Sequence, residues 1–141
     1  MCIRDRRKGF LDLTVEDLDR SLQGNVHGLF NFAQASLPLL LKAVDADGIK
    51  YPPTLIITGA TASLKGSARF ADFAAGKFAV RAMGQSLARE FAPQGVHVAH
   101  TVVDGVIDIP RTKAYEVNGG GPDSKIDPDA VSGLRSPADH G

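Results

Sequence analysis

The sequence predicts an α/β protein in which amphipathic helices alternate with strands of a parallel sheet. Three observations support this: a long helical pattern early in the chain, two short apolar runs, and a second helical pattern between them. Continuous apolar runs are typical of parallel strands buried on both faces. A strand, a crossover helix and a following strand form a right-handed βαβ unit. The expected order is therefore helix, strand, helix, strand.

The first helix is expected over residues 15–37. Thr14 suits the N-cap, and Glu16 and Asp17 in the first turn complement the positive end of the helix dipole. Pro38 is expected either to kink this helix or to begin a second turn. One apolar face recurs at steps of three and four residues, and its members are Leu18, Leu22, Val26, Leu29, Phe30, Phe32, Ala33 and Leu37.

The first strand is expected at residues 54–58, where a β-branched apolar run ends at Gly59. A loop of small residues, 60–72, separates this strand from the next helical pattern. That pattern predicts a second helix over residues 73–91, because apolar residues return near helical spacing. The helix is expected to stop at the sequence Pro-Gln-Gly of residues 93–95.

The second strand is expected at residues 96–103, another apolar run, which ends at Asp104. The glycine-rich stretch 119–123 predicts a loop. Residues 127–141 show too little apolar periodicity to predict an element. We therefore expect the chain to become irregular after its second strand.

Composition narrows the class of protein. The 16 Lys and Arg residues balance the 16 Asp and Glu residues, which removes the broad electrostatic case for nucleic acid or an anionic membrane. The single cysteine, Cys2, forms neither an intramolecular disulfide nor a multi-cysteine metal site. No apolar run approaches the roughly 18 residues of a membrane span. We expect a cytoplasmic protein without a signal peptide or a metal site.

The opening residues of the chain have neither helical nor strand periodicity. Residues 1–6, Met-Cys-Ile-Arg-Asp-Arg, resemble the translation of a transposon-type sequencing adaptor. We therefore expect residues 1–8 to be non-native or disordered and exclude them from the fold. The alternative is a genuine, basic and disordered N-terminus.

Several segments follow one another in a characteristic order and spacing: Asn25–Pro38, Thr54–Gly66, Phe73–Val80, Ser86–Val98 and Asp104–Asp108. Together they resemble the short-chain dehydrogenases/reductases, a family with a Rossmann-like, doubly wound parallel sheet. The first three segments resemble, in order, the family's fourth helix, its fifth strand with the loop of its catalytic serine, and its active-site helix. The resemblance covers residues 15–112. It implies a partial Rossmann-like domain at 9–112, followed by an irregular loop and tail at 113–141.

The resemblance also implies an active site. In the family a tyrosine is the general acid/base, and a lysine one helical turn later lowers its pKa and bonds the nicotinamide ribose. A serine holds the substrate oxygen, and an asparagine anchors a water that links the lysine to solvent. Lys77 matches the lysine and Asn25 the asparagine, so both are candidate catalytic residues. Lys77, Gly105 and Ile107 are the candidate cofactor-binding residues.

Two of the family's catalytic positions carry other residues here. Phe73 occupies the tyrosine position and cannot transfer a proton, and Ala60 occupies the serine position. Asp104 replaces the family's proline, and Ile109 replaces a threonine, with Thr112 nearby. Three residues near Ala60 carry hydroxyl groups that could replace that of the family's serine: Thr58, Thr61 and Ser63. None of them matches the serine position by register. Ordinary tyrosine-dependent chemistry is therefore not expected.

The family's phosphate-binding turn, Thr-Gly-x-x-x-Gly-x-Gly, does not occur in the 141 residues. Thr58-Gly59-Ala60 does not replace it, because Gly59 and Gly66 are too far apart and no helix begins directly behind them. We therefore expect a truncated fragment that is inactive alone. His27, His97 and His100 are not at metal-ligand spacing and are interpreted as structural.

The parent protein is expected to be an NAD(P)-dependent oxidoreductase that transfers hydride between nicotinamide and a carbonyl/alcohol substrate. NAD or NADP is the implied cofactor, and a small molecule is the implied substrate. The resemblance also implies a homo-oligomer, since the fourth and fifth helices of the family form a dimer interface. The alternative function is a non-catalytic dinucleotide-binding or interaction protein, in which Phe73 and Ala60 mark the loss of chemistry.

Overall fold

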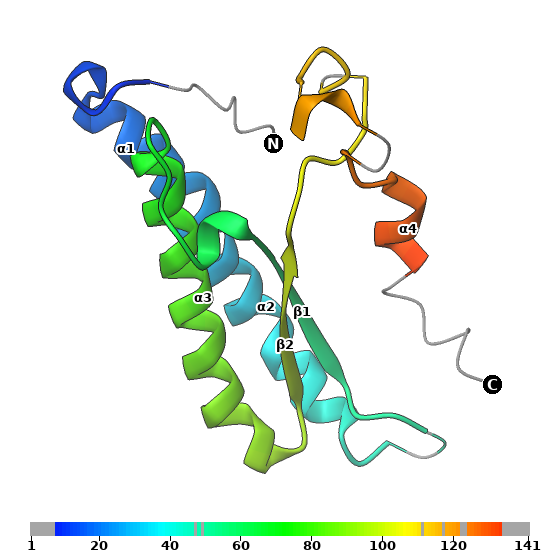
Figure 1. The fold of residues 1–141 in the computed structure, drawn as a ribbon. Helices are drawn as coiled ribbons and strands as arrows, with labels where there is room; N and C mark the ends of the chain where they lie inside the picture. The colour runs from blue at the N-terminus through cyan, green and yellow to red at the C-terminus, as the bar shows by residue number, and fades with distance from the viewer. Residues whose placement is uncertain are drawn as a thin grey trace. The chain divides into compact units, whose positions relative to one another are not determined.

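The computed structural model describes residues 8–46, 48, 50–110, 112–116, 118–121 and 124–133. The chain divides into two compact units, Met1–Val102 and Val103–Gly141. The first unit has the predicted order of helix, strand, helix, strand (Figure 1). Residues 1–7, within the segment expected to be non-native, lie outside the described residues.

The first helical region is longer than predicted. It consists of α1 (Val15–Leu22), a π-helical turn η2 (Gln23–His27) and α2 (Gly28–Ala43), which follow one another without a break. The predicted end at Leu37 is wrong, because α2 continues through Pro38. A proline inside a helix costs about 3 kcal/mol. The turn after it packs apolar residues on the core, which offsets this cost.

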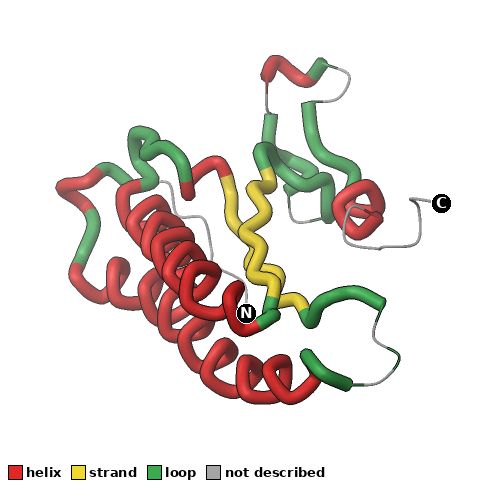
Figure 2. The backbone as a smooth tube through the Cα atoms, turned by 90° about the horizontal axis from the view of Figure 1, so that it is seen from below, coloured by secondary structure: helices red, strands yellow, loops and turns green. Residues whose placement is uncertain are grey.

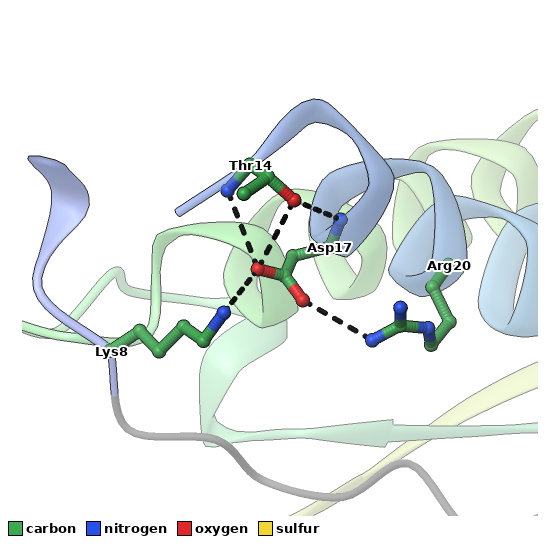
Figure 3. Close-up of polar contacts among 4 residues, drawn as sticks. All are labelled: Lys8, Thr14, Asp17 and Arg20. Atoms are coloured by element: carbon green, nitrogen blue, oxygen red, sulfur yellow. Dashed lines mark hydrogen bonds and ion pairs between the residues drawn. The ribbon is translucent and has the colours of Figure 1, made fainter. Parts of the chain in front are cut away.

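A network of polar contacts holds the start of α1 (Figure 3). Thr14 Oγ1 accepts the Asp17 amide at 3.3 Å, and the Asp17 carboxylate accepts the Thr14 amide at 3.3 Å, which confirms the predicted N-cap. Lys8 Nζ lies 2.5 Å from one carboxylate oxygen, and Arg20 Nη1 lies 3.2 Å from the other. The hydrogen bond from Lys8 is the main cause that lowers the pKa of Asp17 to about 2.

The sheet consists of β1 (Thr54–Ala60) and β2 (His97–Val103), which are hydrogen-bonded to each other (Figure 2). The His97 amide donates to the Pro53 carbonyl, and the Thr101 hydroxyl donates to the Ile57 carbonyl. Residue numbers therefore rise together along both strands, so the pair is parallel, as predicted.

The prediction that the first strand is buried on both faces is wrong. Along β1 buried and exposed residues alternate: Leu55 and Ile57 are buried, whereas Ile56 between them is 43% exposed. In the part of the first unit that the structure describes, the helices pack on one face of the strand pair only (Figure 2). Successive side chains of a strand point to opposite faces, so only every second side chain meets these helices.

The crossover helix α3 (Ala71–Phe91) packs on β1 and α1 and begins two residues before its predicted start. A short 3-10 turn follows it, and Gly95 then adopts a left-handed conformation with φ 84°, in which glycine avoids the steric cost of a side chain. The core of the first unit joins α2, β1, α3 and the residue just before β2. Its buried members are Ala33, Leu37, Leu55, Ile57, Val80 and Val96.

The second unit contains less regular structure. An isolated parallel bridge joins Ile107 to Ile126, and a short helix, α4 (Pro128–Gly133), follows. This helix falls within the stretch 113–141 that the sequence predicts to be irregular. None of the helices in the described ranges is both long and apolar enough to cross a membrane.

Replacing Asp17 with asparagine should remove an acid-sensitive contribution to stability. The pKa of Asp17 is lowered from 3.8 to about 2, so its contacts stabilise the folded state fully above 3.8 and are lost as the pH falls toward 2. The wild-type chain should lose more stability than Asp17→Asn across that interval in denaturant unfolding. Asp19→Asn, an exposed change in the same helix, is the control and should keep the wild-type profile.

Candidate functional site

Lys77 of α3 lies at the carboxyl end of β1. Its ammonium nitrogen donates a hydrogen bond to the Thr58 carbonyl at 3.3 Å. The same nitrogen lies 6.0 Å from the centre of the Phe73 ring. Residues four apart share one face of a helix. The sequence spacing and the structure therefore agree that the side chains of Phe73 and Lys77 are neighbours.

The Phe73 ring lies beside the Lys77 ammonium group, at the position where the sequence analysis expects the family's tyrosine. The Phe73 ring is half-buried and also packs on Phe70, with ring centres 6.5 Å apart. A positive charge near an aromatic face is attracted by the ring quadrupole. The Phe73 ring therefore stabilises the ammonium group of Lys77 but neither donates nor accepts a proton.

The loop after β1 uses its polar groups internally. The Ala60 amide donates to Ser63 Oγ at 3.1 Å, and Arg81 Nη1 donates to the Ser63 carbonyl at 3.3 Å. Ser63 is 0% exposed. Of the three hydroxyl groups open as substitutes for the family's serine, the one on Ser63 is therefore closed off from any substrate. Thr58 is exposed and Thr61 is half-buried.

Asn25 lies in the π-helical turn and is buried, with 8% of its surface exposed. Its Nδ2 donates to the Ser21 carbonyl at 3.0 Å, while the Ser21 hydroxyl donates to the Asp72 carbonyl at 2.9 Å. A Cβ atom at position 76 would lie 2.9 Å from Ser21 Oγ and 3.0 Å from Asn25 Nδ2. Gly76 thus lets α3 approach closely, and Asn25 lies beside the residue that precedes Lys77.

The other candidate residues belong to the second unit. A Cβ atom at Gly105 would lie 2.9 Å from Ile126 Cδ1, and Ile107 forms the strand bridge to the same isoleucine. The Thr112 hydroxyl hydrogen-bonds the Ile107 and Ile109 carbonyls. Within this unit, Gly105 and Ile107 therefore both lie next to the same residue, Ile126.

His100, which the sequence analysis interprets as structural, lies beside the same end of β1. The His100 ring contacts Gly59, and burial is the main cause that lowers its pKa below 6.5, followed by the positive charges of Arg81 and Lys77. The available signal was its place in a strand, on the same face as the core residues Val96 and Val98. In the described ranges no three His, Cys, Asp or Glu residues are grouped to hold a metal ion.

A family model described as short chain dehydrogenase matches residues 3–117. An uncharacterized oxidoreductase of Staphylococcus epidermidis is 30% identical over 105 residues, which are 74% of this chain and 42% of that protein.

Solved structures agree with these matches. A short-chain dehydrogenase from Rhodopseudomonas palustris has 28% identity and a TM-score of 0.60, covering 85% of this chain and 55% of that one. A short chain dehydrogenase from Escherichia coli CFT073, complexed with NADPH, has 27% identity and a TM-score of 0.69, covering 90% of this chain and 49% of that one. The likeness confirms the predicted Rossmann-like α/β fold. The chain spans about half the length of the relatives it matches.

Gly76→Ala should destabilise the chain by about 1–3 kcal/mol, because the added methyl group overlaps the polar side chains of Ser21 and Asn25. Gly28→Ala is the matched control in a helix, since its Cβ would meet only the Gln23 carbonyl, at 4.0 Å. This control should be neutral or stabilising by up to about 1 kcal/mol. Urea unfolding of both variants measures the difference, and equal effects would contradict the close packing at Gly76.

Proposed function

The chain belongs to the short-chain dehydrogenase family of oxidoreductases, and from this we propose that its parent protein transfers hydride between NAD(P) and a carbonyl/alcohol carbon. The observation that carries the proposal is the ammonium group of Lys77, which the Thr58 carbonyl holds at the end of β1. By its place in the sequence, Lys77 corresponds to the family's lysine and Asn25 to its asparagine. Asn25 packs against Gly76, the residue that precedes Lys77.

The residues present fit the nicotinamide side of such a cofactor. Lys77 offers an ammonium donor that is only half-buried, at the carboxyl end of a parallel strand, where ligands bind in open α/β sheets. When bound, the nicotinamide supplies or accepts the hydride. Lys77 would bind and orient the ribose hydroxyl groups. The E. coli relative, complexed with NADPH, supports this cofactor class.

Proton transfer in this site needs a group other than those of the family. Phe73 lies beside the Lys77 ammonium group, whose nitrogen is 6.0 Å from the centre of the ring, but holds no exchangeable proton. Ala60 offers no hydroxyl, and its amide is used by Ser63. A carbonyl substrate that receives a hydride must also receive a proton on its oxygen, so we propose that a different donor supplies it.

The alternative function is a dinucleotide-binding protein without catalysis. The half-buried Phe73 ring beside Lys77 favours it, because this pair keeps a charge that can contact the cofactor but has no tyrosine to act as the acid.

We also propose that the parent is a homo-oligomer. Its support is an apolar groove of about 460 Å³ between α2 and α3, which Phe30, Leu37, Met83, Leu87 and Phe91 help to line.

The 141 residues alone should bind NADH and NADPH more weakly than micromolar. They contain no family phosphate-binding turn, and the relatives extend to about twice their length. Titration by nicotinamide fluorescence measures this binding. Submicromolar binding by the 141 residues would contradict the expectation that tight binding requires the family's phosphate-binding turn.

In the parent protein, Lys77→Ala should weaken cofactor binding about tenfold or more, the loss typical of a charged hydrogen bond. Lys42→Ala, an exposed change on α2, is the control and should leave cofactor binding unchanged.

Phe73→Tyr alone should restore little carbonyl reduction in the parent protein, because Ala60 leaves the substrate oxygen without a hydroxyl partner. Phe73→Tyr combined with Ala60→Ser should restore more than the sum of the single changes, since residues that act as a unit are not additive. Initial rates with NADPH test this. If the wild type already reduces carbonyls rapidly and both changes slow it, the site uses another acid and the register is wrong.

A further inference from the structure

The end of β1 carries a contact that the proposed function does not use. His100 lies within β2, and its imidazole fills the space beside Gly59, where a Cβ atom would overlap ring atoms Cε1 and Nε2. Nε2 is buried and has no hydrogen-bond partner in the described part of the chain. We propose that His100 is a positioning residue of the site: its neutral ring fixes the end of β1 and thereby the ammonium group of Lys77.

The His100 ring is held between the sheet and α3. On the strand side Gly59 leaves it room. On the helix side a Cβ atom at Gly84 would lie 3.9 Å from His100 Cβ and only 3.1 Å from Ile57 Cδ1. Gly59 therefore leaves room for the imidazole, while Gly84 leaves room mainly for Ile57 and is in ordinary contact with the His100 Cβ atom.

The backbone transmits the position of Gly59 to its neighbours. The Thr58 carbonyl, which accepts from Lys77 at 3.3 Å, belongs to the peptide unit just before Gly59. The Ala60 amide, which donates to Ser63 at 3.1 Å, belongs to the peptide unit just after it. Peptide units are planar and rigid, so a shift of the Gly59 Cα atom moves both groups. The His100 ring thus acts on Lys77 through the Thr58 carbonyl.

The charges around His100 require its neutral form. Lys77 and Arg81 of α3 face it, and both lower its pKa after the larger effect of burial. The loop contributes the Ser63 hydroxyl, which would lie 3.0 Å from a Cβ atom at Gly59, and β1 contributes no ionisable side chain. Among the described residues no negative charge contributes to this shift. Protonation would place another cation beside Lys77 and weaken its hold on Thr58.

This role of His100 rests on the proposed function, because Lys77 matters for catalysis only if it binds the cofactor. The ammonium group of Lys77 can nevertheless be observed without any cofactor. A failure of NADPH binding would therefore contradict the proposed function alone. The positioning role of His100 is tested by measurements that need no cofactor.

The first test follows the 1H–15N NMR signal of the Lys77 ammonium group in the full chain as the pH crosses 6.5, the ordinary pKa of histidine. The wild type should show an inflection below pH 6.5, and His100→Gln should abolish it. His97→Gln is the matched control, since His97 is exposed on the same strand, and it should keep the inflection. An inflection that persists in His100→Gln, or that is absent from the wild type, would overturn the proposal.

A second test uses the space beside Gly59 and does not depend on pH. Gly59→Ala should raise the unfolded fraction about tenfold or more, the usual effect of overpacking a filled site. In a His100→Ala background the same change should cost much less, because the ring no longer occupies the space. Gly66→Ala, whose Cβ meets nothing within 4 Å, is the control and should have little effect in either background. An equal cost of Gly59→Ala in both backgrounds would also overturn the proposal.

Discussion

The close approach of α3 to its neighbours is the constraint on which the rest of the structure depends. Gly76 lets the helix lie against the polar side chains of the π-helical turn, and Gly84 lets it lie against Ile57 of β1. A Cβ atom at position 76 would lie 2.9 Å from Ser21 Oγ, and one at position 84 would lie 3.1 Å from Ile57 Cδ1, so the neighbouring side chains would have to shift. Because Lys77 follows Gly76 on this helix, its reach to the Thr58 carbonyl is a consequence of the same packing.

The packing fixes the surroundings of the charged group at the carboxyl end of β1. Lys77 has a carbonyl partner on one side and an aromatic ring on the other. Ala60, the last residue of β1, donates its amide to the fully buried Ser63 in the turn that follows. The carbonyl and the ring both attract the positive charge and so favour one position of the ammonium group.

Most of the secondary structure of the first unit was predictable, because it depends on local periodicity and capping. Thr14 begins the first helix as its sequence indicates, and the glycine at position 95 ends the crossover helix region. Pro38 misled the prediction, because the cost of a proline is local while the burial that outweighs it comes from tertiary contacts. The exposure of Ile56 could not be predicted either. A β-branched run has the same sequence pattern whether helices cover one face of the strand or both.

The sequence by itself determined that Phe73 and Lys77 share one helix face, and it predicts that Ala60 occupies the family's serine position. Only the tertiary structure decided which other side chains meet there. The contact of His100 with Gly59 joins residues on different strands, and no local pattern records it. Periodicity specifies the face on which a residue lies, whereas the partner on that face depends on how distant segments pack.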